Sequence, residues 1–399
     1  MKNNHIVIVS LQSWDSNIGS NCINIAKEFS KENRVLYVNR ASDRFSNIKK
    51  FFNPKKKLEK DLNPLNFYSL EHPMNNLWVL DTGVVLESIN WLPNPFFDFF
   101  NKLNGKKFAN PIKRAIDELG FDNVVLFVDN DFMRAQFLPN ILGVNCFIYY
   151  IRDHLLTQPY FKRHGARLES KISKRADFIV ANSSYLAEYG SRFNPKSFDI
   201  GQGCDFTYFN PAIAYDKPSE LKKLSGPIIG YVGSLVSFRL DINLLLNLVS
   251  KRPDWNWVFV GPEDEIFKVS QLHEFPNVFF LGRKNEEVLA SYVSHFDVCI
   301  NPQLVNETTI GNYPRKVDEY LAMGKPVVAS YTEFMKGFLP LVRLCTNCEE
   351  YESSIQETLG EINKTDLSKK RQDFALTHTW ESSVDKIYNL YKNEIESNG

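Results

Sequence analysis

Two adjacent cations open a predicted helix in the last third of this 399-residue chain. In the run PRKVDEYLAMGKPVVAS, Pro314 suits a first helical turn because its missing N–H is no loss there, and apolar residues then recur at helical spacing up to Gly324. Arg315 and Lys316 lie at the end where the helix dipole disfavours positive charge. Cations at this end make sense beside a bound anion, because the free N–H groups of a helix N-terminus already favour one. The spacing therefore predicts an anion site.

The elements around this helix place it at a sheet edge. The β-branched run at 327–330 predicts a buried strand after the helix, so the helix begins at the carboxyl edge of a parallel sheet, where ligands usually bind. Another predicted strand, 228–232, ends at Gly233 and Ser234, with Arg239 close behind. A small residue and a guanidinium suit a diphosphate. The alternative is an ordinary strand–loop–helix turn with a solvated arginine.

The helix segment resembles the "Pro-x-Lys-x-x-Glu-Tyr-Leu-Ala-x-Gly-Lys-Pro-Val-Val" sequence of group 1 (GT4-like) glycosyltransferases with the GT-B fold. The loop at Gly233 is similar to the "Tyr-x-Gly-x-(five)-Lys/Arg" loop of that family. The resemblance implies that Glu319 binds the ribose of a nucleotide-sugar donor and that the helix start and the preceding loops hold its diphosphate. The family pattern has a further glutamate where this chain has Gly311, and Glu307 lies farther upstream. This departure resembles a subgroup that includes the teichuronic-acid-type cell-wall transferases.

Three further residues are donor-side candidates. Thr308 and Thr309 carry hydroxyls and backbone N–H groups that suit a phosphate, and they equally suit a capped loop. Arg283 lies where the base-binding loop of the family runs, although backbone atoms often make that contact. Glu319 itself has the alternative of being a surface acid on the helix.

Candidate catalytic residues lie in the first half of the chain. Asp153 and His154 follow a predicted strand that ends at Ile151, and Asp15 follows the first strand, so we expect all three to face a cleft between two domains. An inverting transferase needs a group that takes the proton of the acceptor hydroxyl, and Asp153 is the best placed for it. In a retaining enzyme these residues orient sugar or acceptor instead. The remaining alternative is a helix-capping aspartate beside an exposed histidine.

Predicted strands alternate with predicted helices in the first half of the chain and again in the second half. This pattern predicts an α/β protein with two Rossmann-like, doubly wound domains. We expect an acceptor-binding domain at 1–211, a linker at 212–226, a nucleotide-sugar domain at 227–378, and a C-terminal helix at 379–399. The resemblance implies the GT-B arrangement, in which that helix returns to the first domain.

Composition narrows the partners. Lys+Arg and Asp+Glu are both 47, so a nucleic-acid partner is not expected. No apolar run reaches the ~18 residues that span a bilayer, and the N-terminus does not resemble a signal peptide, so we expect a cytoplasmic protein. Cys345 and Cys348 lack a second pair at zinc spacing and are interpreted as a chance pair. No DxD-like pair lies where a metal is expected, and we expect the protein to use neither a metal nor a cofactor.

Two segments interleave aromatic residues with lysines, at 48–60 and 91–108. Segments of this kind suit the surface of an anionic bilayer, which predicts a peripheral membrane contact. The alternative is an amphipathic helix packed on the sheet with solvated lysines.

These features together predict a metal-independent glycosyltransferase. It would move a sugar from a UDP- or GDP-sugar to a glycan or polyprenyl-linked acceptor in bacterial surface polysaccharide biosynthesis. A catalytically silent GT-B protein and a sugar-nucleotide epimerase of the same fold are the alternatives. A nucleotide-dependent oxidoreductase is disfavoured, because the loop at 10–14 lacks the G-x-G-x-x-G sequence.

Overall fold

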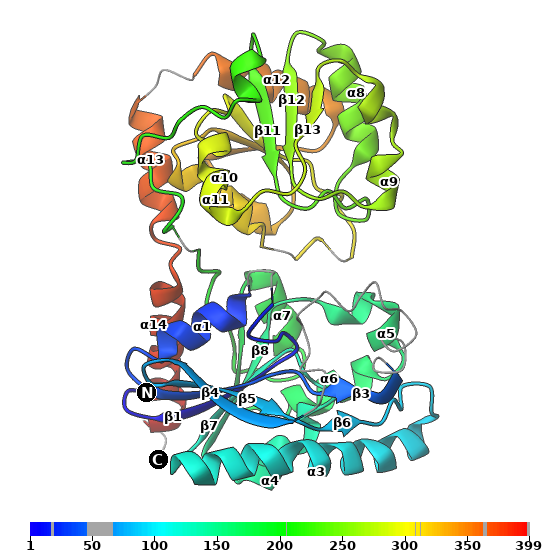
Figure 1. Ribbon diagram of the computed structural model, residues 1–399, viewed down its shortest axis with the longest axis vertical. Coiled ribbons are helices and arrows are strands. Elements are labelled where there is room, and N and C mark those ends of the chain that lie inside the picture. The colour runs from blue at the N-terminus through cyan, green and yellow to red at the C-terminus, as the bar shows by residue number, and fades with distance from the viewer. Residues whose placement is uncertain are drawn as a thin grey trace. The chain divides into compact units, whose positions relative to one another are not determined.

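The computed structural model describes residues 1–16, 20–45, 67–204, 206–307, 309–311, 313–361 and 365–396. The chain forms two compact units, which Figure 1 shows. Unit 1 comprises Met1–Gly201 with Trp380–Gly399, and unit 2 comprises Gln202–Thr379.

The boundary between the units differs from the one that the sequence predicts. The first domain was expected to run to residue 211, with a linker at 212–226. Residues 202–211 and the expected linker both belong to unit 2. The cause is local pairing: the N–H of Cys204 donates to the carbonyl of His378 at 2.9 Å, and Cys204 forms a parallel bridge with Thr379. These contacts tie the chain to unit 2 as soon as it leaves unit 1.

Unit 1 is built on an eight-stranded sheet of order β10-β9-β8-β7-β1-β2-β5-β4, parallel except for the β4–β5 pair. Its strands are β1 (His5–Ser10), β2 (Arg34–Val38), β4 (Tyr68–Met74), β5 (Leu77–Thr82), β7 (Val125–Asp129), β8 (Cys146–Ile151), β9 (Phe178–Ala181) and β10 (Ser197–Asp199), and β3 (Ser42–Asp43) pairs separately with β6 (Val85–Leu86). The chain order reverses between β1 and β7, which is the point where ligands bind in such sheets.

Helices cover both faces of this sheet because its strands are apolar on both sides. Val7 and Val9 lie in one core with residues of α3, α6 and α7, whereas Ile6 and Ile8 lie in another with residues of α1 and α14. The helices of unit 1 are α1 (Asn21–Phe29), α3 (Asn94–Leu119), α4 (Leu138–Leu142), α5 (Pro159–Lys162), α6 (Gly165–Ser173), α7 (Ser184–Ser191) and α14 (Trp380–Tyr391), with 3₁₀ turns at Ala135–Phe137 and Leu155–Thr157 and a π-helical turn at Lys392–Glu396.

Unit 2 contains a six-stranded parallel sheet of order β13-β12-β11-β14-β15-β16. Its strands are β11 (Ile228–Val232), β12 (Asn256–Val260), β13 (Val278–Phe280), β14 (Val298–Asn301), β15 (Val327–Ser330) and β16 (Val342–Cys345). Its helices are α8 (Ile242–Lys251), α9 (Glu265–Lys268), α10 (Glu286–Val293), α11 (Arg315–Ala322), α12 (Cys348–Leu359) and α13 (Thr365–Ala375), with 3₁₀ turns at Leu221–Lys223, Gln271–Glu274 and Phe334–Phe338. The order reverses between β11 and β14, directly beside the start of α11.

Candidate functional site

The residue that follows β11 in unit 2 has a backbone conformation that favours glycine. Gly233 has a φ of 137°, and a Cβ atom there would lie 2.8 Å from the Nζ of Lys316. Its N–H donates to the carbonyl of Val260 at 2.9 Å, and a Cβ on Gly261 would lie 2.0 Å from the Gly233 oxygen. The ends of two neighbouring strands therefore approach each other closely. Because Gly233 and Gly261 have no side chains, no Cβ atom covers the backbone at these two positions.

Helix α11 is fixed against this strand end. Its apolar stripe consists of Val317, Tyr320 and Leu321 and is fully buried. Arg315, Lys316 and Glu319 lie outside this stripe. The hydroxyl of Tyr320 accepts a hydrogen bond from the N–H of Val232 at 2.8 Å. This bond sets the distance between the start of α11 and the loop after β11.

Charged side chains gather at the first turn of α11. Lys316 donates to the hydroxyl of Tyr231, and its Nζ lies 4.0 Å from the centre of that ring. Burial lowers the pKa of Lys316 to about 7; the charge of Glu319 opposes this shift, and Arg239 and Arg315 add to it. The Nε of Arg315 donates to Glu319 at 3.1 Å. Three cations and one carboxylate thus share one small region.

Glu319 is not the surface acid of the alternative interpretation. Its side chain is 13% exposed, and burial raises its pKa while the charges of Arg315 and Lys316 lower it. A carboxylate held in this way accepts hydrogen bonds from hydroxyls well, because its neighbours fix its orientation.

Arg239 is brought to the same region by its backbone. The N–H of Leu304 donates to the carbonyl of Arg239 at 2.8 Å, and the amide of Asn306 donates to the carbonyl of Phe238 at 3.1 Å. The loops after β11 and β14 are therefore joined at the reversal point of the sheet. The guanidinium of Arg239 is exposed, so it is accessible to an anion.

The remaining donor-side candidates have different surroundings. Thr309 is 1% exposed, its hydroxyl donates to the carbonyl of Leu304, and its N–H donates to that of Asn306 at 3.0 Å, as the capped-loop alternative describes. Thr308 lies outside the described residues. Arg283 is exposed in the loop between β13 and α10.

Sequence reasoning missed Tyr231 and Tyr320. Neither hydroxyl was given a role, yet they hold Lys316 and the backbone of Val232. The available signal was chemical: a tyrosine in a fully buried position needs a partner for its hydroxyl, and such partners are usually polar groups at the edge of an element.

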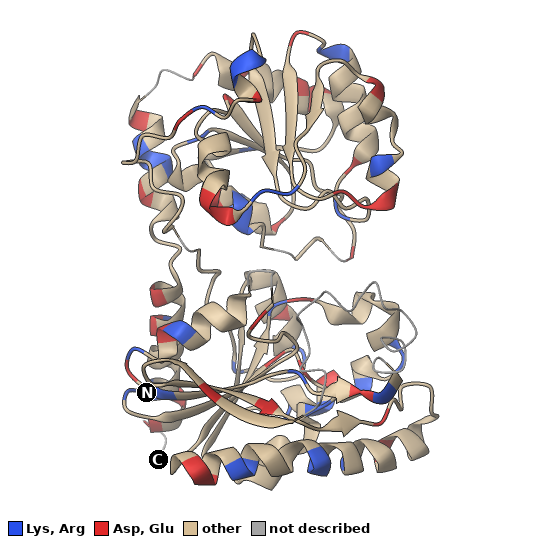
Figure 2. Cartoon of the chain, viewed as in Figure 1, with Lys and Arg blue, Asp and Glu red and all other residues tan. Residues whose placement is uncertain are grey.

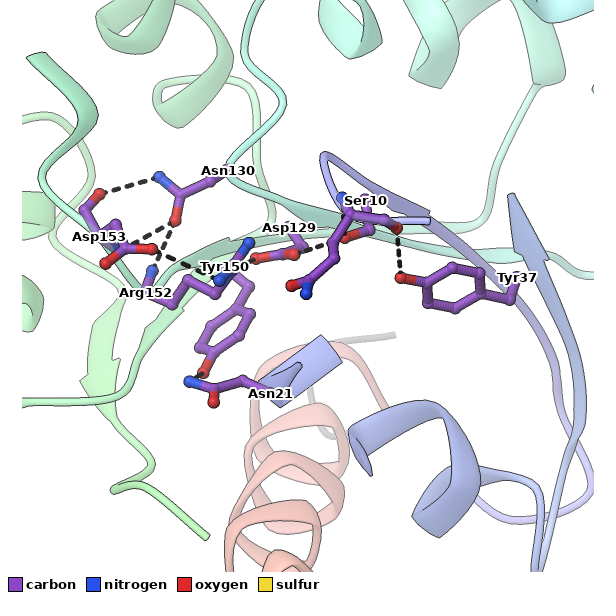
Figure 3. Close-up of polar contacts among 9 residues, drawn as sticks. Ser10, Asn21, Tyr37, Asp129, Asn130, Tyr150, Arg152 and Asp153 are labelled. Carbon is purple, nitrogen blue, oxygen red and sulfur yellow. Dashed lines mark hydrogen bonds and ion pairs between the residues drawn. The ribbon is translucent and has the colours of Figure 1, made fainter. Parts of the chain in front are cut away.

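A second polar cluster lies at the carboxyl ends of β1, β7 and β8 in unit 1, which Figure 3 shows. Asp129 is fully buried and accepts hydrogen bonds from the hydroxyl of Ser10 at 2.7 Å and from the Nε of Arg152 at 2.6 Å. The ion pair with Arg152 and the hydrogen bond from Ser10 together join three adjacent strand ends at the reversal point of the sheet.

Asp153 is positioned by this cluster. The side chain of Asn130 (φ 53°) accepts from the N–H groups of Arg152 and Asp153 at 2.7 and 3.2 Å and donates to the carbonyl of Asp153 at 3.1 Å (Figure 3). The carboxylate of Asp153 lies 3.4 Å from Arg152 and is 39% exposed. It is thus both oriented and open to a substrate.

The other two catalytic candidates, His154 and Asp15, have different surroundings from those of Asp153. His154 is half-buried, and its ring packs 4.7 Å from that of Tyr189. Asp15 is exposed after β1, and β7 lies between β1 and β8. Asp153 therefore has the more defined surroundings of the three.

The two late cysteines lie at the end of β16 and the start of α12. Cys345 is buried at the end of β16, where its thiol donates to Ser354 at 3.3 Å, and Cys348 begins α12. Among the described residues, no group of three or more His, Cys, Asp or Glu side chains is arranged to hold a metal ion.

Comparison with known proteins identifies the domain that carries the cationic cluster. Residues 226–339 match the family model described as "Glycosyl transferases group 1". Unit 2 contains a group 1 glycosyltransferase domain. TuaH of Bacillus subtilis (strain 168), named for a role in teichuronic acid biosynthesis, is 25% identical over 248 residues, which are 57% of this chain and 60% of TuaH. The match thus spans less than two thirds of that relative.

Solved structures with the GT-B fold resemble the whole chain. Sucrose-phosphate synthase from Thermosynechococcus elongatus has a TM-score of 0.70 at 16% identity and covers 99% of this chain and 100% of its own. HepE from Anabaena, solved in complex with UDP, has a TM-score of 0.67 at 16% identity, with 98% and 100% covered. Trehalose 6-phosphate synthase from Burkholderia multivorans gives 0.69 at 9% identity, with 100% of both chains covered. The predicted GT-B fold is confirmed.

Proposed function

We propose that this protein transfers a sugar from a nucleotide-diphospho-sugar to a glycan or polyprenyl-linked acceptor in bacterial surface polysaccharide biosynthesis. The observation that supports this best is the cluster of Arg315, Lys316 and Glu319 at the start of α11, inside the matched glycosyltransferase domain. UDP is the first choice of donor nucleotide, because HepE was solved with UDP and with UDP-glucose.

Each side chain has a distinct role in the proposed donor site. Glu319 accepts hydrogen bonds from the ribose hydroxyls, and Arg315 holds its carboxylate in place. Lys316 and Arg239 neutralise the diphosphate, together with the N–H groups of α11 and the bare backbone at Gly233. Preorganised cations stabilise the charge that develops as the nucleoside diphosphate leaves, so no metal ion takes part in the proposed reaction.

Unit 1 provides the acceptor side of the proposed reaction. Asp153 receives the proton of the attacking hydroxyl if the configuration of the sugar is inverted, and it orients the acceptor if the configuration is retained. His154 and Asp15 are proposed to orient the acceptor. The proposed place of action is the cytoplasm, at the inner face of the membrane.

The donor site can be tested by titrating the protein with UDP, GDP, ADP and CDP, each with and without EDTA. We expect one nucleoside diphosphate to bind, unaffected by EDTA. Glu319→Gln should weaken its binding roughly 10- to 100-fold, since a hydrogen bond to a charged group contributes about 1.5–3 kcal/mol. Glu357→Gln changes an exposed glutamate of α12 that is paired with Arg343 of β16; it is the matched control and should bind as the wild type does.

Four outcomes argue against this proposal. Binding that requires a divalent cation would contradict the metal-free mechanism. Equal binding by the Glu319 and Glu357 variants would remove Glu319 from the site. Conversion of the sugar nucleotide without any acceptor would identify an epimerase, and binding without turnover of any acceptor would identify a silent protein.

The membrane contact is proposed for the start of α3. Trp91, Phe96 and Phe99 are 70%, 60% and 62% exposed, Leu103 is 47% exposed, and Figure 2 shows basic segments along the same helix. An exposed aromatic face beside lysines suits an anionic bilayer surface. The other segment, 48–60, lies outside the described residues. Within the described part of the chain, no helix is both long and apolar enough to cross a membrane.

Vesicle co-sedimentation tests this contact. The double variant Phe96→Ser with Phe99→Ser should lose most of its binding to vesicles that contain an anionic phospholipid, because it removes the exposed apolar area. Leu376→Ser, which changes a 54% exposed apolar residue of unit 2, is the control. Unchanged binding by the double variant would contradict the proposal.

A further inference from the structure

A buried carboxylate lies on the first turns of α11, next to the residues of the proposed donor site. Asp318 is fully buried, and its Oδ2 accepts a hydrogen bond from the hydroxyl of Tyr313 at 2.5 Å and from the thiol of Cys204 at 3.5 Å. Its Oδ1 lies 2.8 Å from the Nδ1 of His378. The neighbouring residue, Glu319, belongs to the cationic cluster. One turn of helix therefore carries the proposed ligand contacts and an internal polar anchor.

The partners of Asp318 are held firmly themselves. His378 packs among three aromatic rings, with Phe374 at 4.7 Å, Phe338 at 6.0 Å and Tyr313 at 6.2 Å between ring centres. The hydroxyl of Tyr313 also lies 3.0 Å from the Nδ1 of His378. A buried carboxylate with several donors is costly to disturb, because the loss of one partner leaves an incompletely paired charge.

Two of these partners stand at the places where the chain passes between its units. The chain enters unit 2 at Gln202 and leaves it at Thr379. Cys204 and His378 lie within two residues of these points, and they are joined to each other by the hydrogen bond from the Cys204 N–H to the His378 carbonyl. Both passages of the chain are thus attached to the same carboxylate.

The thiol of Cys204 links this anchor to the first turn of α11 a second time, because it also lies 3.7 Å from the carbonyl of Arg315. Arg315 in turn holds Glu319. The path from the proposed ribose ligand to the two passages therefore consists of direct contacts within unit 2.

We propose that Asp318 and His378 form a latch that couples the donor helix α11 to both passages of the chain, so that a nucleotide bound at α11 also rigidifies these passages. The proposal rests on the proposed function, because the nucleotide is its ligand. A ligand that restrains α11 restrains every segment that is rigidly bonded to it, and hydrogen exchange measures such restraint. Asp318 and His378 act as positioning residues and do not touch the nucleotide.

Hydrogen exchange of the full-length protein, with and without saturating UDP, tests the latch. In the wild type we expect UDP to slow exchange in α11 and also at Cys204 and at 376–379, about fivefold or more, the lower end of typical couplings between sites. In His378→Phe, which keeps an aromatic ring and removes the donor to Asp318, UDP should still slow exchange in α11 but no longer at 376–379, whereas Cys204 keeps its thiol contacts with α11. A purely structural role for His378 would not separate these two responses.

Two other variants complete the test. Tyr313→Phe removes one donor to Asp318 with little change of volume, and it should reduce the coupling in part. Asp297→Asn is the control, because the Asp297 carboxylate also accepts a hydrogen bond, from the backbone N–H of Ile228 at 2.7 Å, and this bond involves neither Asp318 nor His378. It should keep the full response.

The outcomes are distinguishable. Slowed exchange in α11 alone in the wild type, or an unchanged response in His378→Phe, would overturn the latch and leave the proposed donor site standing. The absence of any effect of UDP on wild-type α11 would overturn both the donor site and the latch.

Discussion

Lys316, which is proposed to contact the diphosphate, combines two properties. It lies beside the bare backbone of Gly233, and burial with neighbouring arginines lowers its pKa to about 7. In the absence of ligand the ammonium is therefore largely neutral at pH 8. A bound diphosphate brings negative charge next to it, which raises the pKa towards the ordinary value for lysine. Binding and protonation of Lys316 are consequently linked.

This linkage predicts proton uptake when UDP binds. At pH 8, calorimetric titration in two buffers of different ionisation enthalpy should reveal an uptake approaching one proton, because the terminal phosphate, with a second pKa of about 6, is already ionised. Affinity should fall as the pH rises above 7, since binding then also requires the protonation of Lys316, which costs more free energy as the pH rises. At pH 6 the lysine is already charged, and its share of the uptake should disappear.

The control for this prediction is Lys316→Gln, which has no titrating group. It should bind UDP more weakly at pH 6 and show no proton uptake at pH 8. Identical apparent binding enthalpies in the two buffers for the wild type at pH 8 would contradict the linkage.

Individual residues were predictable where a motif carries them. The place of Arg315 and Lys316 at a predicted helix start indicated an anion site, and the resemblance to group 1 glycosyltransferases implied a role for Glu319. Asp318 was counted only as a helical residue, since its partners are distant in sequence and a periodic pattern contains no information on them. The burial of the Thr309 hydroxyl depends in the same way on the path of its loop.

At the scale of elements, the strand ends of unit 1 illustrate the same limit. The strands β7 and β8 were predictable from their apolar runs, but the pairing of Asp129 with Arg152 was not. A carboxylate at the end of a buried strand is equally compatible with a solvated turn. Only the parallel register of β7 and β8, with Asp129 opposite Tyr150, brings Arg152 back over Asp129.

Two substitutions at this edge should differ in their effect on stability. Arg152→Met leaves Asp129 buried without its cation and should lower the free energy of unfolding by about 3–5 kcal/mol. Asp153→Asn changes a 39% exposed side chain and should leave stability within about 0.5 kcal/mol of the wild type. Denaturant unfolding measures both.

Sugar transfer separates the functional from the structural role of this edge. If the acceptor hydroxyl loses its proton to Asp153, Asp153→Asn should reduce turnover by about 10²–10⁴-fold, the usual contribution of a general base, while UDP binding is unchanged. Turnover within a factor of about three of the wild type would remove Asp153 as the base.

At the scale of the whole molecule, the C-terminal helix matters because it belongs to unit 1 although it follows unit 2 in sequence. Ile387 is fully buried in α14 with Trp380 and Val384, in the same core as Ile6 and Ile8 of β1. The amide of Asn33 donates to the hydroxyl of Tyr388 at 2.9 Å. Unit 1 is therefore complete only when the last segment of the chain is in place.

This division predicts that one substitution and one ligand act on separate parts of the unfolding curve. Ile387→Ala should destabilise unit 1 by about 2–5 kcal/mol, because it removes buried methyl groups and leaves a cavity. UDP at 100 times its Kd should stabilise unit 2 by about 2.7 kcal/mol. In native-state hydrogen exchange, the variant should lower protection in β1, β7 and α14, whereas UDP should raise it in β11, β14 and α11, in the variant as in the wild type. Ile387→Val, with an expected cost of about 0.5–1.5 kcal/mol, grades the first effect. If Ile387→Ala abolished the response of unit 2 to UDP, the two units would have to unfold as one cooperative body. Unit 1 and unit 2 would then have no separate free energies of unfolding.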